Sequence, residues 1–282
     1  MVAKAGTGKI AIIENISEKE IIAGANLGMY IAGTGTSSGK NTGKITTTTG
    51  TGVYVDGATN SFDGTGGTIT SGGVGISLNG TAAGQIKTGT LDIKPDGVGV
   101  YGTGTGTGTE NINLIMTAGI TLGNNNSIGV YAKNINSNVT GDISTGTDTS
   151  IGIVSEGNGN ITYTGDMAIG NKSVGIYKFD GTGTITTSAG NWNIGNNGYG
   201  IFLKQSAEQK VTINNSADMS LGTASVGIFS NGKNEVNNTG NIIVGMTDLN
   251  GETHENVQKH LNSVGIYVTG GTTATSSGTI TV

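Results

Sequence analysis

The residues best able to carry chemistry lie in one short stretch near the C-terminus. This stretch holds both histidines of the chain and four further charged residues: Asp248, Glu252, His254, Glu255, Lys259 and His260. His254, Glu255 and His260 could bind a metal ion, but the histidines are six positions apart rather than the four of a helical zinc pair. We therefore interpret the stretch as a solvated surface loop and a possible contact loop for a partner, since function gathers on loops held by a rigid scaffold.

The remaining acidic residues are too scattered to form a catalytic group. Polysaccharide-cleaving enzymes need carboxylates or basic residues clustered on one face, whereas most of the acids here occupy turn-like sequence: Asp63, Asp92, Asp142, Asp166, Asp180 and Asp218. The Gly-x-Gly run at 104–108 lacks the lysine and strand-to-helix context of a phosphate loop. We predict no catalytic, cofactor-binding or metal site, and no enzyme.

Composition excludes further classes of function. Charged residues are 12% of the 282 residues and the net charge is -5, so no basic patch exists for nucleic acid. There is no cysteine, and therefore no disulfide or thiolate chemistry. No run of 18 apolar residues is present, so we expect no membrane insertion by this segment. The N-terminus does not resemble a signal peptide, and the last residues read as a strand cut mid-coil, which suggests an internal piece of a longer protein.

The elements that position these residues are defined by a repeat. An apolar residue, a glycine, a second apolar residue and usually an aromatic recur ten times, as in Val174-Gly175-Ile176-Tyr177 and Val264-Gly265-Ile266-Tyr267. The ten glycines are separated by 24, 23, 24, 30, 23, 23, 25, 27 and 38 residues. A near-constant spacing of this size is the signature of a solenoid.

Each repeat has room for three short strands divided by turns. In one unit they are 174–177, 184–186 and 192–194, with Asp180-Gly181 and Gly190 in the turns. We predict an all-β, right-handed parallel β-helix of about ten to eleven coils, roughly 50 Å long at ~4.8 Å per coil. Residues 1–26 form a lead-in segment or first partial coil, and 27–282 form the array, with insertions near 102–111 and 248–262. A β-sandwich of short hairpins would not repeat one motif ten times.

Strand alternation predicts which side chains face the core. The residue after each motif glycine is apolar in all ten copies, and the residue before it is apolar or aromatic in nine, so we assign both to the interior. Glycine and the fourth motif residue then share the outer face. The aromatic members of that column are Tyr30, Tyr54, Tyr101, Tyr131, Tyr177, Phe202, Phe229 and Tyr267. They form either a structural ladder of stacked rings or a stripe that binds a protein or a sugar.

The recurring Ser-Val-Gly-Ile-Tyr at 173–177 and 263–267, joined to Gly-x-Ile-Thr and Ile-Gly-Asn-Asn, resembles the passenger region of large autotransporter adhesins of the fusobacterial type. The resemblance extends from about Gly24 to the C-terminus. It implies a secreted β-helical passenger at the cell surface, attached to the outer membrane through a barrel domain that this chain lacks. Such passengers serve in coaggregation and host-cell attachment, and therefore in virulence.

Two functions remain open at this stage. The first is an adhesin or stalk segment that binds a protein or glycan on a host or bacterial cell without catalysis. The second is a carbohydrate-binding or carbohydrate-cleaving β-helix of the tailspike or pectin-lyase kind. A pair of acids close together on one face would favour the cleaving enzyme.

Overall fold

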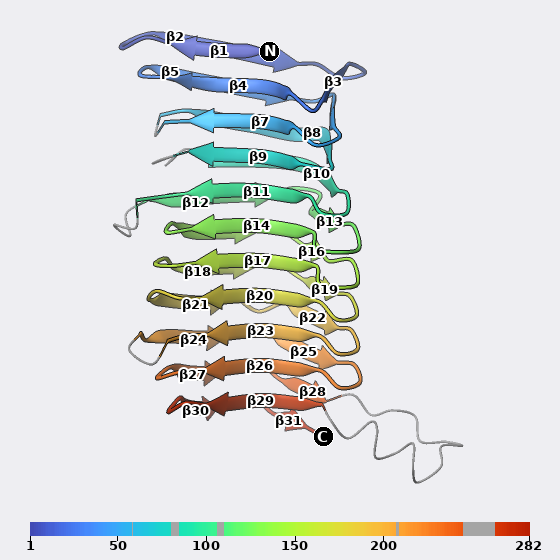
Figure 1. Cartoon of the computed structure of the whole chain (residues 1–282), viewed down its shortest axis with the longest axis vertical. Coiled ribbons are helices and arrows are strands. Elements are labelled where there is room, and N and C mark those ends of the chain that lie inside the picture. Colours follow the sequence, from blue (N-terminus) through green and yellow to red (C-terminus); the bar gives the residue numbers. More distant parts are fainter. Residues whose placement is uncertain (58, 80–84, 106–109, 207–208, 245–262) are drawn as a thin grey trace, which may run out of the picture.

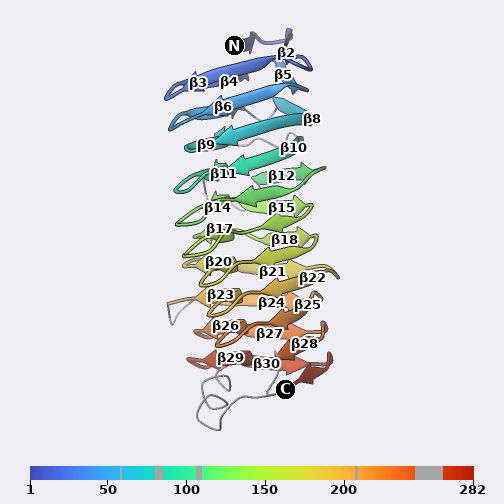
Figure 2. The same ribbon diagram turned by 90° about the vertical axis from the view of Figure 1, so that its right-hand side faces the viewer.

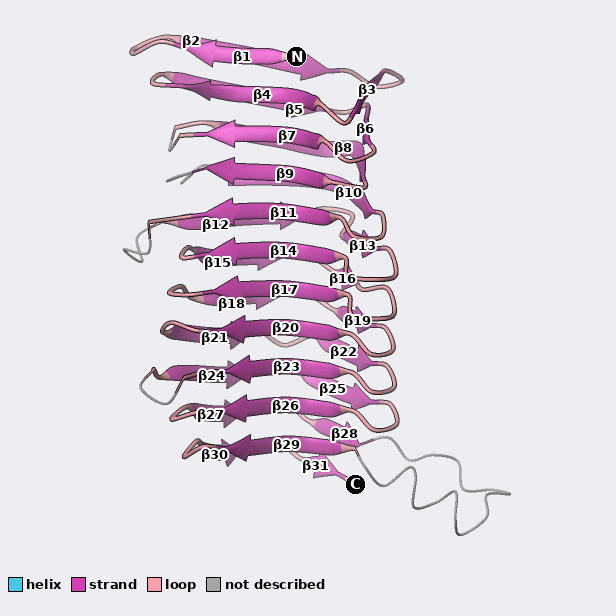
Figure 3. Cartoon of the chain, in the orientation of Figure 1, coloured by secondary structure: helices cyan, strands magenta, loops and turns pink. Residues whose placement is uncertain are grey.

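The computed structural model consists of strands and turns wound into a single right-handed parallel β-helix (Figures 1 and 3). It describes the chain except for residues 58, 80–84, 106–109, 207–208 and 245–262. The described part contains no helix. The coils stack along the long axis, with the N-terminal coil at one end and the C-terminal coil at the other (Figure 2). The predicted fold class is confirmed.

The first sheet contains one strand from each coil and presents the repeated motif. Its eleven strands pair in parallel in this order: β1 (Val2–Ala5), β4 (Leu27–Gly33), β7 (Thr51–Asp56), β9 (Val74–Asn79), β11 (Val98–Thr103), β14 (Ile128–Lys133), β17 (Ile151–Glu156), β20 (Val174–Phe179), β23 (Tyr199–Lys204), β26 (Val226–Asn231) and β29 (Val264–Thr269).

On the other two faces of the β-helix the strands of successive coils also pair in parallel. The second face holds β2 (Ile10–Asn15), β5 (Thr36–Asn41), β8 (Ser61–Ser71), β10 (Gln85–Ile93), β12 (Asn111–Met116), β15 (Asn136–Thr140), β18 (Ile161–Thr164), β21 (Gly183–Thr187), β24 (Val211–Asn215), β27 (Glu235–Asn238) and β30 (Thr273–Ser276). The third holds β3 (Glu20–Gly24), β6 (Lys44–Thr47), β13 (Ile120–Leu122), β16 (Ile143–Ser144), β19 (Met167–Ile169), β22 (Asn191–Ile194), β25 (Asp218–Leu221), β28 (Ile242–Val244) and β31 (Ile280–Thr281). The long strands β8 and β10 turn the corner and pair on both faces.

The core is a stack of aliphatic columns, because each coil places its inward residue directly above that of the coil before. The residue after the motif glycine is fully buried from Met29 to Ile228, and in the last coil Ile266 is partly buried. Three aromatic residues, Phe62, Tyr163 and Trp192, also lie inside, and the ring centroids of the last two are 5.7 Å apart. Burial of this apolar surface is the main stabilising term for strands too short to stand alone.

The alternation expected from the sequence is wrong at the motif glycine. Val174 is partly exposed, Gly175 and Ile176 are both buried, and Tyr177 is partly exposed again. A Cβ at Gly175 would lie 2.6 Å from the carbonyl oxygen of Gly200 in the next coil and 2.7 Å from Ile169 Cδ1. Glycine is therefore required because coils approach closely on the inner side, and the residue before it belongs to the outer face instead of the core.

Polar side chains in the turns bind each coil to its neighbours. The motif serine donates to a backbone carbonyl in the preceding coil, as from Ser173 Oγ to Gly146 O at 2.9 Å and from Ser225 Oγ to Gly195 O at 2.6 Å. Asparagine oxygens accept from backbone N–H groups of the next coil, as Asn196 does from Thr223 at 2.8 Å. These bonds pair backbone polar groups at the corners with side chains of the neighbouring coil, and they explain why serine and asparagine recur there.

The structure also refines the predicted segments. Residues 1–26 contribute three strands, β1 to β3, to the first coil. The connection near 102–111 lies between β11 and β12, and only its ends are described. The insertion near 248–262 lies outside the described residues.

Candidate functional site: an aromatic stripe

The most distinctive surface feature is a column of rings on the outer face of the first sheet. We call it the aromatic stripe, and it consists of Tyr30, Tyr54, Tyr101, Tyr131, Tyr177, Phe202, Phe229 and Tyr267. The strand register places these residues in line, since Tyr30 pairs with Tyr54, Tyr101 with Tyr131, and Tyr177 with Phe202. All are partly exposed, and Tyr267 in the last coil is 49% exposed. The predicted outward direction of these rings is confirmed.

Neighbouring rings of the stripe stack on each other. Ring centroids are 5.5 Å apart for Tyr30 and Tyr54, and 5.4 Å apart for Tyr101 and Tyr131. In the C-terminal half, Phe202 lies 4.6 Å from Phe229. Offset stacking at such distances adds about 0.5–1.5 kcal/mol per pair beyond the buried area. The rings therefore stabilise the sheet while each remains partly exposed to solvent.

The stripe is interrupted twice, at Ser77 and at Val154. Ser77 stands between Tyr54 and Tyr101 and is partly exposed. Val154 stands between Tyr131 and Tyr177 and is 3% exposed. The rings thus fall into two pairs and a longer C-terminal group.

The C-terminal group is wider than the sequence predicted. Tyr199, which precedes a motif glycine and was assigned to the core, lies on the outer face with its ring centroid 4.9 Å from that of Phe202. Phe179 lies two residues beyond Tyr177 and contacts it with centroids 5.1 Å apart. Alternation beyond the motif could have identified Phe179, but Tyr199 could not be placed without knowing that the glycine interrupts the alternation.

A charged group adjoins the middle of the stripe. Tyr131 donates its hydroxyl hydrogen to Glu156 Oε2, and Lys133 Nζ lies 2.7 Å from Glu156 Oε1. Partial burial, followed by the bond to Glu156, raises the pKa of Tyr131. The Lys133 ammonium and then the Tyr131 hydroxyl lower the pKa of Glu156. The carboxylate is held ionised by these bonds, which makes it a poor general acid.

Two hollows flank Tyr177. One is an apolar groove between the rings and the residues that precede the motif glycines, lined by Ile151, Val174, Tyr177, Tyr199 and Phe202 with Thr149 and Lys172 at its rim. The other lies toward the following turn and is lined by Tyr177, Phe179, Asp180, Lys204, Gln205 and Ser206. The surface of the stripe is therefore hollowed on both sides of Tyr177, around β20 and β23.

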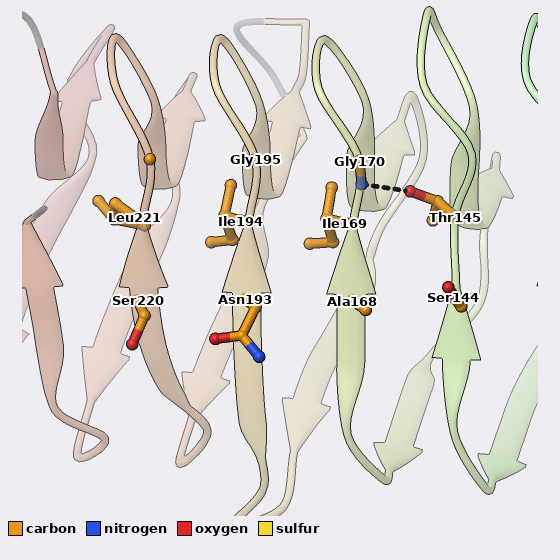
Figure 4. Close-up of a pocket in the computed structure, with 11 residues that line it drawn as sticks. Ser144, Thr145, Ala168, Ile169, Gly170, Asn193, Ile194, Gly195, Ser220 and Leu221 are labelled. Carbon is orange, nitrogen blue, oxygen red and sulfur yellow. Dashed lines mark hydrogen bonds between the residues drawn. The ribbon is translucent and has the colours of Figure 1, made fainter.

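A third hollow lies on the opposite side of the array and has no reactive lining. It is a shallow groove across β16, β19, β22 and β25, where Ser144, Ala168, Asn193 and Ser220 lie in a row (Figure 4). The Gly170 N–H donates to Thr145 Oγ1 at 2.9 Å along its edge. None of the side chains that line it is titratable.

The scattered acids serve as local structural groups. Asp142 and Asp166 each accept a backbone N–H from the next coil, at 3.0 and 2.8 Å, and Asp218 does the same at 2.6 Å. Asp92 pairs with Lys94, and Asp63 caps the nearby Thr65 N–H. Among the described residues, no three histidine, cysteine or acidic side chains come together as a metal site would require.

The predicted contact loop cannot be compared with the structure. Asp248, Glu252, His254, Glu255, Lys259 and His260 all lie outside the described residues. The loop remains a prediction from sequence, as does its role toward a partner.

Comparison with known proteins finds no matching family model, curated protein or solved structure. Within the described residues no helix is long and apolar enough to cross a membrane.

Proposed function

We propose that this chain is a rigid, non-catalytic segment of a cell-surface adhesin or stalk, and that the aromatic stripe is its contact surface. The observation that carries the proposal is the line of partly exposed rings along one face of a straight array. Tyrosine and phenylalanine are enriched in protein interfaces because they bury much area at low entropic cost. The partner is a protein or glycan on a host or bacterial cell.

Two features favour binding over catalysis. Five of the six scattered acids are engaged by backbone N–H groups or by a lysine, as Asp142, Asp166 and Asp92 are, which leaves Asp180 without a second free carboxylate among them. The stacked coils form one continuous hydrogen-bonded unit, which suits a spacer that holds a contact surface away from its anchor. The resemblance to autotransporter passengers agrees with this proposal and with a place at the outer membrane surface.

The proposal is tested by comparing adhesion with stability. A variant with Tyr30→Ser, Tyr54→Ser and Tyr101→Ser should bind host and bacterial cells at least fivefold more weakly than the parent chain, with a small change in Tm. A matched variant on the second face, with Asn113→Ser, Asn138→Ser and Asn214→Ser, should bind as the parent does. Equal adhesion by all three proteins would overturn the proposal.

A further inference from the structure

The two ends of the β-helix expose the edges of its three sheets. Within the described residues, β1, β2 and β3 of the first coil pair on one side only, with β4, β5 and β6 of the second coil. In the last coil β29, β30 and β31 pair in the same way with β26, β27 and β28 alone. Each end therefore presents three strands with unpaired backbone groups, and because all the pairings are parallel, the strands at the two ends run in the same direction.

Core positions are uncovered in the last coil. Val236 and Ile242 of the preceding coil are fully buried. Their counterparts one coil later are Ala274, which is exposed, and Ile280, which is 39% exposed. In the first sheet Val268 is only partly buried, although it belongs to an inward column. The interior of the β-helix is therefore open at this end.

Exposed apolar side chains gather at the same two ends. Within the described residues, every large apolar side chain that is exposed lies between positions 1 and 27 or between 243 and 282. Ile10, Ile12 and Ile22 of the first coil are 73% to 76% exposed, and Val282 is 87% exposed. Apolar surface concentrated in this way is typical of an interaction surface.

The C-terminal edge lacks the features that keep β edges apart. Residues 263–282 contain no charged residue and no proline, although proteins commonly place a lysine, a proline or an inward-facing charge on a strand that must stay unpaired. In the first coil, Glu14 and Glu20 form ion pairs with lysines of the second coil, at 3.0 and 3.1 Å. Lys4 of β1 would meet no positive charge on the C-terminal edge. The charges of the two ends therefore do not oppose contact between them.

The register of the stack predicts which residues would meet if the last coil of one copy lay before the first coil of another. Following the parallel pairs along each sheet identifies the first-coil and last-coil members of every inward column. One column from each sheet brings together Val268 with Ala3, Ala274 with Ala11, and Ile280 with Ile21. All six residues are apolar, so each column would continue through the junction as an apolar contact.

We propose that the chain associates with a second copy of itself, head to tail, with the C-terminal coil of one copy pairing in parallel with the N-terminal coil of the next. Two like ends could superpose their three faces only with the strands antiparallel, which would lose the register of the stack. The contact uses different surfaces on the two copies, so each dimer keeps one free end of each kind and growth continues into a filament. The aromatic stripe takes no part in the contact, which makes this inference independent of the proposed function.

The test is the state of association of the intact chain. Sedimentation velocity over a concentration series should show a mass that increases in whole multiples of the monomer. Electron microscopy should show single rods that lengthen in steps of roughly 50 Å, the length of eleven coils at ~4.8 Å each. A chain that stays monomeric at every concentration would overturn the proposal and leave these ends to other coils or to a different partner. Rods paired side by side without growth in length would also overturn it, because that contact would use a face instead of an end.

Two variants each block one end. Ala274→Lys places an inward-facing charge on the C-terminal edge, and Ala11→Lys places one on the N-terminal edge. Ala274 is exposed and Ala11 is partly exposed in the single chain, so we expect both variants to fold. Each variant alone should stay monomeric. Mixed in equal amounts they should form dimers and nothing larger, because the intact C-terminal end of Ala11→Lys can still pair with the intact N-terminal end of Ala274→Lys.

A matched control adds the same charge away from the ends. Thr162→Lys alters an exposed residue of β18 in a middle coil and should associate as the parent does. Filaments formed by either end variant alone, or a mixture of the two that stays monomeric, would contradict a head-to-tail contact. The concentration series of the parent decides the proposal even if one variant fails to fold.

Discussion

Two columns of inward-facing residues in the first sheet differ in the residue types that they contain. The column directly after the motif glycine contains only aliphatic residues and Met29. The column two residues later is mixed, with Ile31, Val55, Leu78, Gly102, Ala132, Ser155, Lys178, Leu203, Ser230 and Val268. Both point into the same interior. The difference therefore does not lie in burial alone.

The mixed column tolerates polar residues because it lies closer to the turns. Lys178 is fully buried, yet its Nζ donates to Gly157 O at 2.8 Å and to Ser155 Oγ at 3.2 Å. Ser230 similarly accepts from Asn234 Nδ2 at 3.2 Å. The first column sits beside the motif glycines, where successive coils approach closely, and each of its buried members is apolar. Proximity to turn carbonyls thus decides which core positions accept a polar side chain.

The largest effect should come from placing a charge in the aliphatic column. Ile176→Asp would bury a carboxylate among the aliphatic side chains of adjacent coils, at a cost of several kcal/mol. We expect a large fall in Tm and local opening of β17, β20 and β23, measurable by hydrogen exchange. Near-parental stability would show that this column is not the core.

Lys178 should produce a pH dependence that the aliphatic column cannot. Burial lowers its pKa from 10.5 to about 8. Between these values the unfolded chain keeps the proton that the folded chain has lost, so stability rises with pH, by roughly 3 kcal/mol if the whole shift is realised. Below about pH 8 Lys178 is charged in both the folded and the unfolded chain, so the full cost of burying its charge lowers the free energy of unfolding.

The pH effect is isolated by comparison with Lys178→Met. In denaturant unfolding from pH 7 to pH 10, the free energy of unfolding of the parent should increase relative to that of the variant as the pH rises. The comparison is needed because burial raises the pKa of Tyr131 and Tyr163, which opposes the trend at high pH in both proteins. A constant difference across the range would mean that Lys178 is not desolvated.

The motif glycine should be the next most sensitive position. In Gly175→Ala the new Cβ would meet Gly200 O, Ile169 and Met167 within 2.8 Å, so we expect a loss of about 1–3 kcal/mol from forced displacement. Gly6→Ala is the control, because its Cβ would meet nothing within 4 Å. Thermal melts of both variants suffice, and equal Tm values would contradict the close approach of the coils.

The smallest change is expected on the outer face. Tyr177→Ser removes ring contacts with Phe179 and Phe202 but creates no buried charge, so we expect a loss of roughly 0.5–1.5 kcal/mol. Ser77 already occupies the same column in another coil. If this variant melted as low as Ile176→Asp, the inward and outward assignments would have to be exchanged.

The fold could be predicted because the near-constant spacing of the repeated motif is visible in the sequence itself and is typical of a solenoid. The strands expected at 174–177, 184–186 and 192–194 correspond to β20, β21 and β22. The sequence predicted the stripe because Tyr177 and its equivalents lie three residues after a recurring apolar position. It failed on Val174 and Tyr199 because simple alternation takes no account of two successive inward residues at a glycine. The hollows beside Tyr177 depend on contacts between coils, which no single repeat encodes.

Labelling at single cysteines tests the central claim most directly, because the chain has no cysteine of its own. Ser77→Cys lies in the stripe, Ser220→Cys on the third face, and Ser230→Cys inside. We expect a biotin maleimide to react with the first two in the folded protein and with the third only after denaturation. Streptavidin bound at position 77 should then block cell adhesion, while streptavidin at position 220 should not. Equal adhesion with either site occupied would contradict the assignment of the stripe as the contact surface.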